Sequence, residues 1–437
     1  MIFLFLALFS LTLSHLLYHT ILSPIGLFGV LWNGLLALFE IRLLNYDPLS
    51  EQAYAAFIGS FVLFVCGVVI ATLPVSPVRR WPTPIQVLNP ARARRVLDIL
   101  NALGLLGLLL TTVQLARLVG WGALFETVAV RQAVAGLEAG QFGGGLAGYS
   151  LALAPLAGII GGIYLAQHPS GRSRAMVCLL VSLGNGVLTG NRSLFIWTSV
   201  LFAIAYMLTR VFANHEPVRN LGRLLILASM ALFVVFGAIG LLRFSQFLPY
   251  EESNVNVRLP WMVLQAYHYV TSGFGAFSVH IADPILIDLP GVYSFTPMVR
   301  AVARINSGLA GYSYEYLVQY TTSRPSVYIP VGTNVFTYLA APFDDLGWLG
   351  LILAPLMMGL LSGFVFLKLL KRPSLGVIAC YSLICMQFVY SSVVIITYSN
   401  LPYVIILGLL VLRRHISKKR EHAQHLLPVV DAIGVSK

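Results

Sequence analysis

Arginine and aromatic side chains are concentrated in one stretch of this chain, from Arg243 to Gly350. Half of the 20 tyrosines lie there with Trp261 and Trp348, and the stretch contains no lysine. Aromatic rings stack on the apolar face of a sugar, and a guanidinium group binds phosphate oxygens in pairs. The stretch therefore favours a ligand that is part sugar and part phosphate, or else an interfacial aromatic belt. Its arginines are the first candidates for phosphate binding: Arg243, Arg258, Arg300, Arg304 and Arg324.

Arg192 is the main candidate for phosphate binding outside that stretch. It follows Thr189, Gly190 and Asn191 in a short polar turn between two apolar runs, so its charge is expected close to the membrane surface. A charge at that depth is unfavourable unless it has a partner. A lipid-linked diphosphate would supply one, and so would an ordinary lipid headgroup reached by the side chain.

Arg300 and Arg304 are four residues apart, so they share one face of a helix. The segment Met298–Leu309 around them has an amphipathic pattern. The pair is therefore expected to face either phosphate or anionic lipid.

Arg243 directly follows a predicted span and Arg258 lies in the segment Asn254–Arg258, and either could complete a diphosphate site. Arg324 precedes a proline and has Tyr320 and Tyr328 on either side. Those two rings would form a wall for a saccharide.

Transfer of a sugar from a lipid diphosphate to a hydroxyl needs two kinds of group. Arginines can stabilise the leaving diphosphate without a metal, and a base must remove the proton of the hydroxyl. Asp345 and His268 are the predicted bases, with Asp344 and His280 as alternatives. Asp345 could instead cap the amino terminus of the following helix, and His268 could be a packing residue.

Composition excludes a soluble globular domain. Hydrophobic residues make up 58% of the chain and charged residues 10%, against about 25% charged in typical soluble domains. No metal-ligand spacing, phosphate-binding loop or dinucleotide motif is present, so neither a metal nor another cofactor is expected. The net charge of +12 follows membrane topology and does not indicate nucleic acid.

Apolar runs near the ~20 residues needed to cross a bilayer predict an all-helical, polytopic membrane protein. Eleven such spans are expected: Met1–Leu22, Ile25–Ile41, Ala53–Leu73, Val96–Leu118, Leu146–Ala166, Ala175–Leu188, Leu194–Thr209, Leu224–Leu242, Leu349–Leu370, Leu375–Ser391 and Val393–Leu412. A polar kink at Tyr398–Pro402 is expected near the last two. The predicted regions are a helix bundle over 1–242, an outer segment with amphipathic helices over 243–348, further spans over 349–412 and a basic tail over 413–437.

Most basic residues fall in alternate loops, which the positive-inside rule places in the cytoplasm. These loops contain Arg79, Arg80, Arg92, Arg94 and Arg95; Arg172 and Arg174; Arg210, Arg219 and Arg223; Lys368, Lys371 and Arg372; and Arg413, Arg414, Lys418, Lys419 and Arg420. The segment Arg243–Gly350 and the turn at Arg192 are then outside.

Two short motifs near the end of the outer segment carry a family resemblance. One is an N-x-x-T segment, Asn334 to Thr337, and the other is a D-x-G-x-x-G segment, Asp345 to Gly350, that leads into a span. With the turn at Arg192 and the tyrosine-rich run Tyr267–Phe277, the chain resembles the bacterial oligosaccharide repeat-unit polymerases (O-antigen polymerases, Wzy-type). Asn191 stands where the family more often has serine.

The resemblance implies a glycosyltransferase of the bacterial inner membrane with its active site on the periplasmic face. Its donor and acceptor would be undecaprenyl-diphosphate-linked oligosaccharides, with inversion and no metal. It adds Asn334 and Thr337 to the expected substrate-binding residues, and a chain-length regulator protein could be a further partner. The alternatives are an O-antigen ligase with the same donor and an exporter of lipid or polysaccharide. The sequence lacks the matched halves and midplane charges common in transporters.

Overall fold

The computed structural model of the chain describes residues 1–73, 87–125, 145–189, 192–217, 256, 260–282, 291–307, 313–317, 327–329 and 331–416. The predicted span Leu224–Leu242 lies outside these residues. So do four expected site residues: Arg243, Arg258, Tyr320 and Arg324.

The described part of the chain is mostly helical. Its apolar helices are α1 (Ile2–Tyr18), α2 (Pro24–Glu40), α3 (Glu51–Thr72), α4 (Pro90–Val119), α6 (Gly145–Leu151), α7 (Ala154–Gln167), α8 (Arg172–Thr189), α9 (Ser193–Leu208), α16 (Trp348–Lys371), α17 (Leu375–Val389) and α18 (Leu401–Ile416). The remaining elements are η1 (Gly122–Phe125), η2 (Pro169–Gly171), η3 (Thr209–Ala213), α11 (Trp261–His280), α12 (Thr296–Ile305), β1 (Val327–Ile329), β2 (Val331–Thr333), α15 (Ala340–Leu346) and η5 (Ile396–Tyr398).

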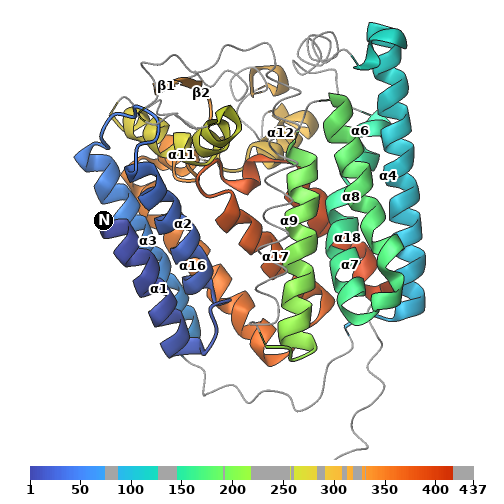
Figure 1. Cartoon of the computed structure of the whole chain (residues 1–437), viewed down its shortest axis with the longest axis horizontal. Coiled ribbons are helices and arrows are strands. Elements are labelled where there is room, and N and C mark those ends of the chain that lie inside the picture. Colours follow the sequence, from blue (N-terminus) through green and yellow to red (C-terminus); the bar gives the residue numbers. More distant parts are fainter. Residues whose placement is uncertain are drawn as a thin grey trace, which may run out of the picture.

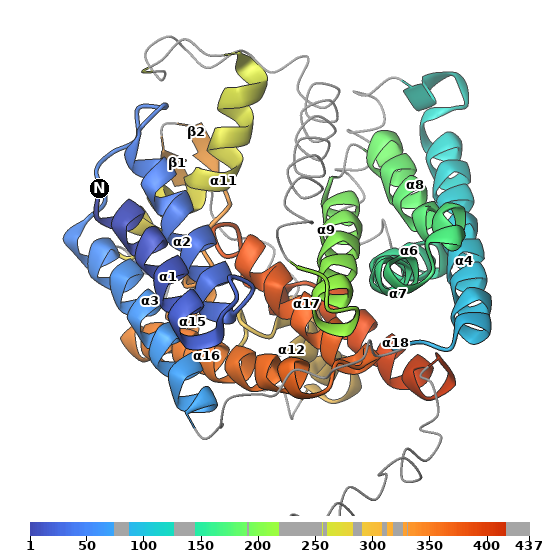
Figure 2. The ribbon, with the colours of Figure 1, turned by 60° about the horizontal axis from the view of Figure 1, so that its bottom comes forward.

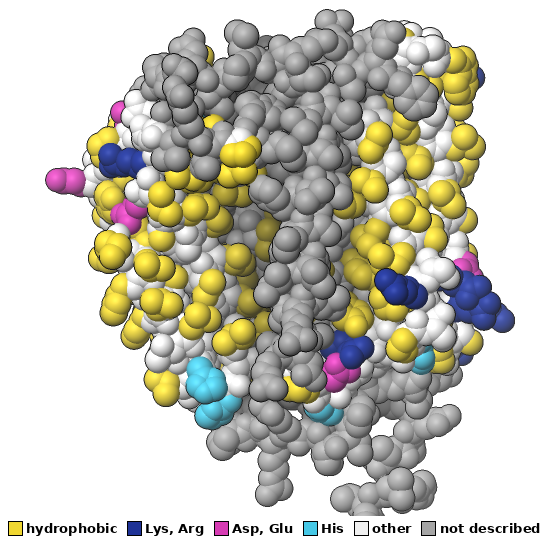
Figure 3. All heavy atoms as spheres, in the orientation of Figure 1, with side chains coloured by type: hydrophobic (Ala, Val, Ile, Leu, Met, Phe, Trp, Pro, Cys, Tyr) yellow, Lys and Arg dark blue, Asp and Glu magenta, His cyan; other side chains and the backbone are white. Residues whose placement is uncertain are grey.

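Five helical stretches among the described residues are long and apolar enough to cross a membrane: Glu51–Thr72, Pro90–Val119, Leu146–Gln167, Ser193–Ala213 and Trp348–Lys371. Large apolar side chains such as Phe5, Leu109, Met357 and Leu407 are exposed on the outer helices. On the face that Figure 3 shows, hydrophobic side chains cover most of the described surface and the few charged ones lie in small groups. Soluble monomers rarely expose so much apolar surface. The protein is therefore a helical membrane protein, and the count of eleven spans stays a prediction.

Side-chain caps fix where several helices begin. In each case the side-chain oxygen of the residue before the helix accepts a hydrogen bond from the backbone N–H three residues later. The capping residues are Ser23 for α2, Ser50 for α3, Asn89 for α4 and Ser374 for α17. Helices α2 and α4 also start with a proline, whose missing N–H costs nothing at that position.

Helix α17 lies between two groups of helices (Figures 1 and 2). On one side it contacts α2 and α16, which pack with α1 and α3, and on the other it contacts α9 and α7, which pack with α8 and α4. Aromatic rings fill the first group: the ring of Phe28 lies 4.2 Å from Phe64 and 5.4 Å from Phe388 of α17. The path of α17 thus places its carboxyl-terminal end, at Val389, between the two groups of helices.

Among the described residues, helix ends that flank the basic loops meet at one end of the bundle, called the basic end. The N–H of Asn89 before α4 donates to the carbonyl of Ile416 in α18. The side chain of Arg174 in α8 pairs with Asp98 in α4 at 2.9 Å. Because loops far apart in sequence gather there, the arrangement of helix ends is the one that the charge pattern predicts. The assignment of this end to the cytoplasm stays a prediction.

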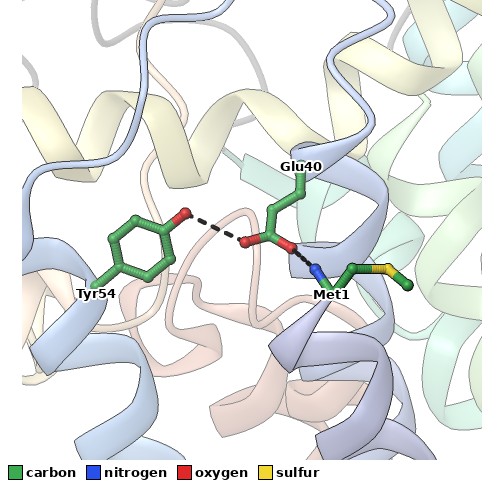
Figure 4. Close-up of polar contacts among 3 residues, drawn as sticks. All are labelled: Met1, Glu40 and Tyr54. Carbon is green, nitrogen blue, oxygen red and sulfur yellow. Dashed lines mark hydrogen bonds and ion pairs between the residues drawn. The ribbon is translucent and has the colours of Figure 1, made fainter.

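The opposite end, called the cap end, carries α11, α12, α15 and the hairpin β1–β2 (Figure 1). At its edge the Glu40 carboxylate accepts a hydrogen bond from the Tyr54 hydroxyl (3.1 Å) and pairs with the amino group of Met1 (2.8 Å), as Figure 4 shows. The hairpin pairs Val327 with Thr333. It is a small addition to the expected all-helical fold.

Two predicted spans are not continuous helices in the structure. The run Leu146–Ala166 is divided into α6 and α7 at residues 152–153. The last helix begins at Leu401 and not at Val393, because residues 390–400 are non-helical apart from the short η5. Tertiary hydrogen bonds replace the helical ones in this break. Ser391 accepts from the N–H of Tyr338, and the Gln387 side chain accepts from the N–H of Ile396 (2.7 Å).

Candidate functional site

Arg192 lies at the start of α9, close to Tyr269 in α11 of the cap end. Its side chain is only 7% exposed, and Cζ lies 5.6 Å from the centroid of the Tyr269 ring. A guanidinium group over an aromatic face is a favourable cation–π pair. The polar turn and the tyrosine-rich run, which are separate features of the sequence, therefore meet in the fold.

Tyr390 extends this aromatic surface from the end of α17. Its ring centroid lies 5.6 Å from that of Trp197 in α9, and its hydroxyl is close enough to Tyr269 for the two to interact electrostatically. Neither Trp197 nor Tyr390 is singled out by the sequence. The signal that could have found Tyr390 is the polar run Tyr390–Ser392, which interrupts an apolar stretch.

Close backbone contact holds α11 over the helix break at residues 390–400. A Cβ placed on Gly273 would lie 1.9 Å from the carbonyl oxygen of Ser392 and 3.4 Å from the carbonyl carbon of Phe336. Only glycine fits there without movement of the backbone. This contact brings α11, the break and the segment after β2 together at one place.

The N-x-x-T segment follows β2 and has two different environments. Asn334 is exposed, whereas Thr337 is 2% exposed and lies beside the backbone contact between Tyr338 and Ser391. The structure therefore places Thr337 beside the helix break at residues 390–400 and leaves Asn334 at the surface.

His268 lies on a different face of α11 from Tyr269. Its Nδ1 is hydrogen-bonded to the Tyr46 hydroxyl (3.0 Å), which also contacts Thr271 (3.1 Å). Burial lowers the pKa of His268 to about 4. A general base works best with a pKa near the working pH, so this environment favours packing over proton transfer.

His280 and Asp344, the alternative bases, form a buried pair. His280 Nε2 lies 2.5 Å from Asp344 Oδ1, and both side chains are at most 4% exposed. The rings of Phe336 and Phe343 pack around the imidazole. Tyr269 and His280 are eleven residues apart, or about 16 Å along the helix axis. The pair therefore ties the end of α11 to α15 at a distance from Arg192.

Asp345 does not cap the following helix, which corrects one of the two predictions for it. Its Oδ1 accepts the N–H of Tyr293 (2.9 Å) and its Oδ2 accepts the N–H of Ser294 (2.8 Å). These residues form the turn before α12, while α16 begins behind Gly347 without a side-chain cap. Burial raises the pKa of Asp345, and the hydrogen bonds from Ser294 and Tyr293 oppose that shift. Both oxygens are used to hold the turn, which favours a structural role over a base.

The glycines of the D-x-G-x-x-G segment also have a structural explanation. Gly347 joins α15 to α16 with φ +58, a conformation that L side chains rarely adopt. A Cβ on Gly350 would lie 1.9 Å from the carbonyl oxygen of Pro342. The motif thus encodes a tight corner that fixes α15, with Asp344 and Asp345, at the start of α16.

We expect Asp345→Asn to lower the stability of the protein, because the amide has one acceptor where two N–H groups donate. Loss of one charge-assisted hydrogen bond corresponds to about 1.5–3 kcal/mol. Thermal unfolding in detergent would measure it, with Asp47→Asn as an exposed control. An Asp345→Asn protein of unchanged stability but without activity would contradict the structural role and restore the predicted base.

The other described candidates lie away from Arg192. Arg300 is half-buried on α12 and Arg304 is exposed there, with Cζ 5.7 Å from the Tyr314 ring. Tyr328 on β1 is 82% exposed. Helix α12 covers Thr296–Ile305, close to the predicted amphipathic segment, and Thr397 of the helix break donates to the Ser294 carbonyl at its start (2.6 Å).

No protein-family model, curated protein or solved structure matches this chain. The family resemblance therefore rests on the motifs of the sequence alone.

Proposed function

We propose that this protein is a glycosyltransferase of the bacterial inner membrane that polymerises undecaprenyl-diphosphate-linked oligosaccharides on the periplasmic face. The observation that carries the proposal is the buried Arg192 over Tyr269, at the end of the bundle opposite the basic loops. A fixed cation beside aromatic rings at that depth suits a phosphate joined to a sugar. The motif resemblance points to the same substrate.

In the proposed reaction, the acceptor hydroxyl attacks the anomeric carbon of the donor glycan. The new glycosidic bond forms as the bond to the diphosphate breaks, with inversion, and the acceptor loses its proton to a base. Arg192 stabilises the charge on the leaving diphosphate. Asp345 and His268 remain the predicted bases, although the contacts of both favour structural roles.

Polymerase and ligase activities differ in their acceptor, so one assay separates them. Purified protein is incubated in detergent with undecaprenyl-diphosphate-linked repeat units alone, and the products are separated by size. We expect a ladder of products. A transfer that requires added lipid A-core, with no ladder from repeat units, would indicate the ligase instead.

The proposal also predicts the orientation of the protein in the membrane. Ser307, after α12, is expected outside, and Ser170, in η2, is expected inside; both are exposed in the structure. Single cysteines at these positions, in a background without the native thiols, would be labelled with a membrane-impermeant maleimide on intact spheroplasts. Labelling at Ser307→Cys and not at Ser170→Cys is the expected result, and the reverse pattern would contradict the orientation.

A further inference from the structure

We propose that buried polar side chains beside Arg192 form a subsite for the sugar that is bonded directly to the lipid diphosphate. This subsite, which rests on the proposed function, has four members: Gln265, Thr337, Tyr390 and Ser392. They would hydrogen-bond the hydroxyl and acetamido groups of that sugar and so determine which donors the protein accepts.

Each of these side chains is buried with a polar atom that has no hydrogen-bond partner among the described residues. The atoms are Gln265 Oε1, Thr337 Oγ1, Tyr390 OH and Ser392 Oγ, and the residues are 8%, 2%, 7% and 1% exposed. A buried polar group without a partner loses its hydrogen bonds to water and gains none in the protein, which destabilises the fold. Several in one region therefore indicate a polar ligand.

The spacing along α11 and the contacts of this helix arrange the four members along one side of it. Gln265, Tyr269 and Gly273 are spaced by four residues and so lie along one face of the helix. That face meets Arg192 at Tyr269 and the Ser392 backbone at Gly273. Tyr390 and Thr337 are placed near this face by the contacts of residues next to them in the sequence.

Tyr390 precedes Ser391, whose carbonyl accepts the N–H of Tyr338, the residue after Thr337 (2.8 Å). The segment 337–338 and the segment 390–392 are thus side by side under α11. The subsite is built from three parts of the chain that only the fold brings together.

The chemistry of the subsite suits a sugar and not a second phosphate. Three hydroxyls can each donate and accept, and the amide adds a further acceptor, which matches the mixed groups of a pyranose ring. The rings of Tyr390, Tyr269 and Trp197 supply an apolar wall beside them. Arg192 lies over Tyr269 on the same side, so the phosphate and its sugar would be neighbours.

The test uses variants that remove one hydroxyl and keep the shape: Tyr390→Phe, Ser392→Ala and Thr337→Val. Tyr149→Phe, at an exposed tyrosine on α6, is the matched control. Thermal unfolding of the full chain in detergent measures binding of three probes. These are undecaprenyl diphosphate, undecaprenyl diphosphate-N-acetylglucosamine and undecaprenyl diphosphate-galactose.

We expect the wild type to bind at least one sugar-bearing lipid more tightly than undecaprenyl diphosphate. Each variant should bind that lipid about three- to tenfold more weakly, the usual effect of one hydrogen bond. Binding of undecaprenyl diphosphate should not change. Without lipid, the variants should unfold at the wild-type temperature or above it, because an unpartnered buried hydroxyl has been removed.

Three results would overturn the subsite and leave the proposed function standing. In the first, the variants bind the sugar-bearing lipid with the same affinity as the wild type. In the second, the wild type binds neither sugar-bearing lipid more tightly than undecaprenyl diphosphate. In the third, the variants unfold at a lower temperature than the wild type without lipid. The last result would mean that the hydroxyls hold ordered water only. A wild type that binds none of the three probes would instead overturn the proposed function.

Discussion

Replacement of Arg192 by lysine is expected to lower product formation about 10- to 100-fold, the effect of losing one charge-assisted hydrogen bond. Lysine keeps the positive charge but has neither the planar fork that binds two phosphate oxygens nor the flat face that stacks on Tyr269. The loss should appear in turnover and in the affinity for undecaprenyl diphosphate together.

The matched control is Arg174→Lys at the basic end, where the arginine pairs with a half-exposed Asp98. Exposed ion pairs contribute about 0–1 kcal/mol, so this variant should behave as wild type. Thermal unfolding of both variants separates loss of function from loss of fold. An Arg192→Lys protein with full activity would remove the diphosphate-binding role.

Replacement of Gly273 by alanine is expected to give a large loss of stability. The new Cβ would lie 1.9 Å from the carbonyl oxygen of Ser392, a backbone atom that no side-chain rotation can move. Overpacking usually costs about 1–3 kcal/mol, and this contact should reach at least the upper value.

Gly376→Ala is the control for that variant, because a Cβ on Gly376 in α17 would meet nothing within 4 Å. Its stability should be unchanged or slightly higher, since alanine favours a helix. Unfolding temperatures of the two purified variants give the comparison. A Gly273→Ala protein as stable as Gly376→Ala would show that α11 does not press on the helix break.

The sequence predicted the features that depend on local composition. Apolar runs indicated the helices of the bundle, and the alternation of basic loops indicated which helix ends gather together, as the contacts of Asn89 and Arg174 show. The polar turn at Arg192 was recognisable because a charge between two apolar runs needs a partner.

Features that depend on long-range contacts were not predictable. Asp345 precedes a helix, which locally favours a cap, but the fold turns its carboxylate to the N–H groups of Tyr293 and Ser294. The helix break after Val389 is similar. The polar residues Tyr398–Pro402 predicted a kink, but the break already begins at Tyr390, where hydrogen bonds of Ser391 and Gln387 replace helical ones.

The most direct test of the proposed function is whether the purified protein releases undecaprenyl diphosphate from a lipid-linked oligosaccharide in detergent micelles. Transport is impossible there, so release measures chemistry alone. We predict release together with elongated lipid-linked glycan from the wild type, and a strongly reduced yield of both from Arg192→Lys. A folded wild-type protein that binds the lipid-linked oligosaccharide and releases no undecaprenyl diphosphate would contradict a glycosyltransferase.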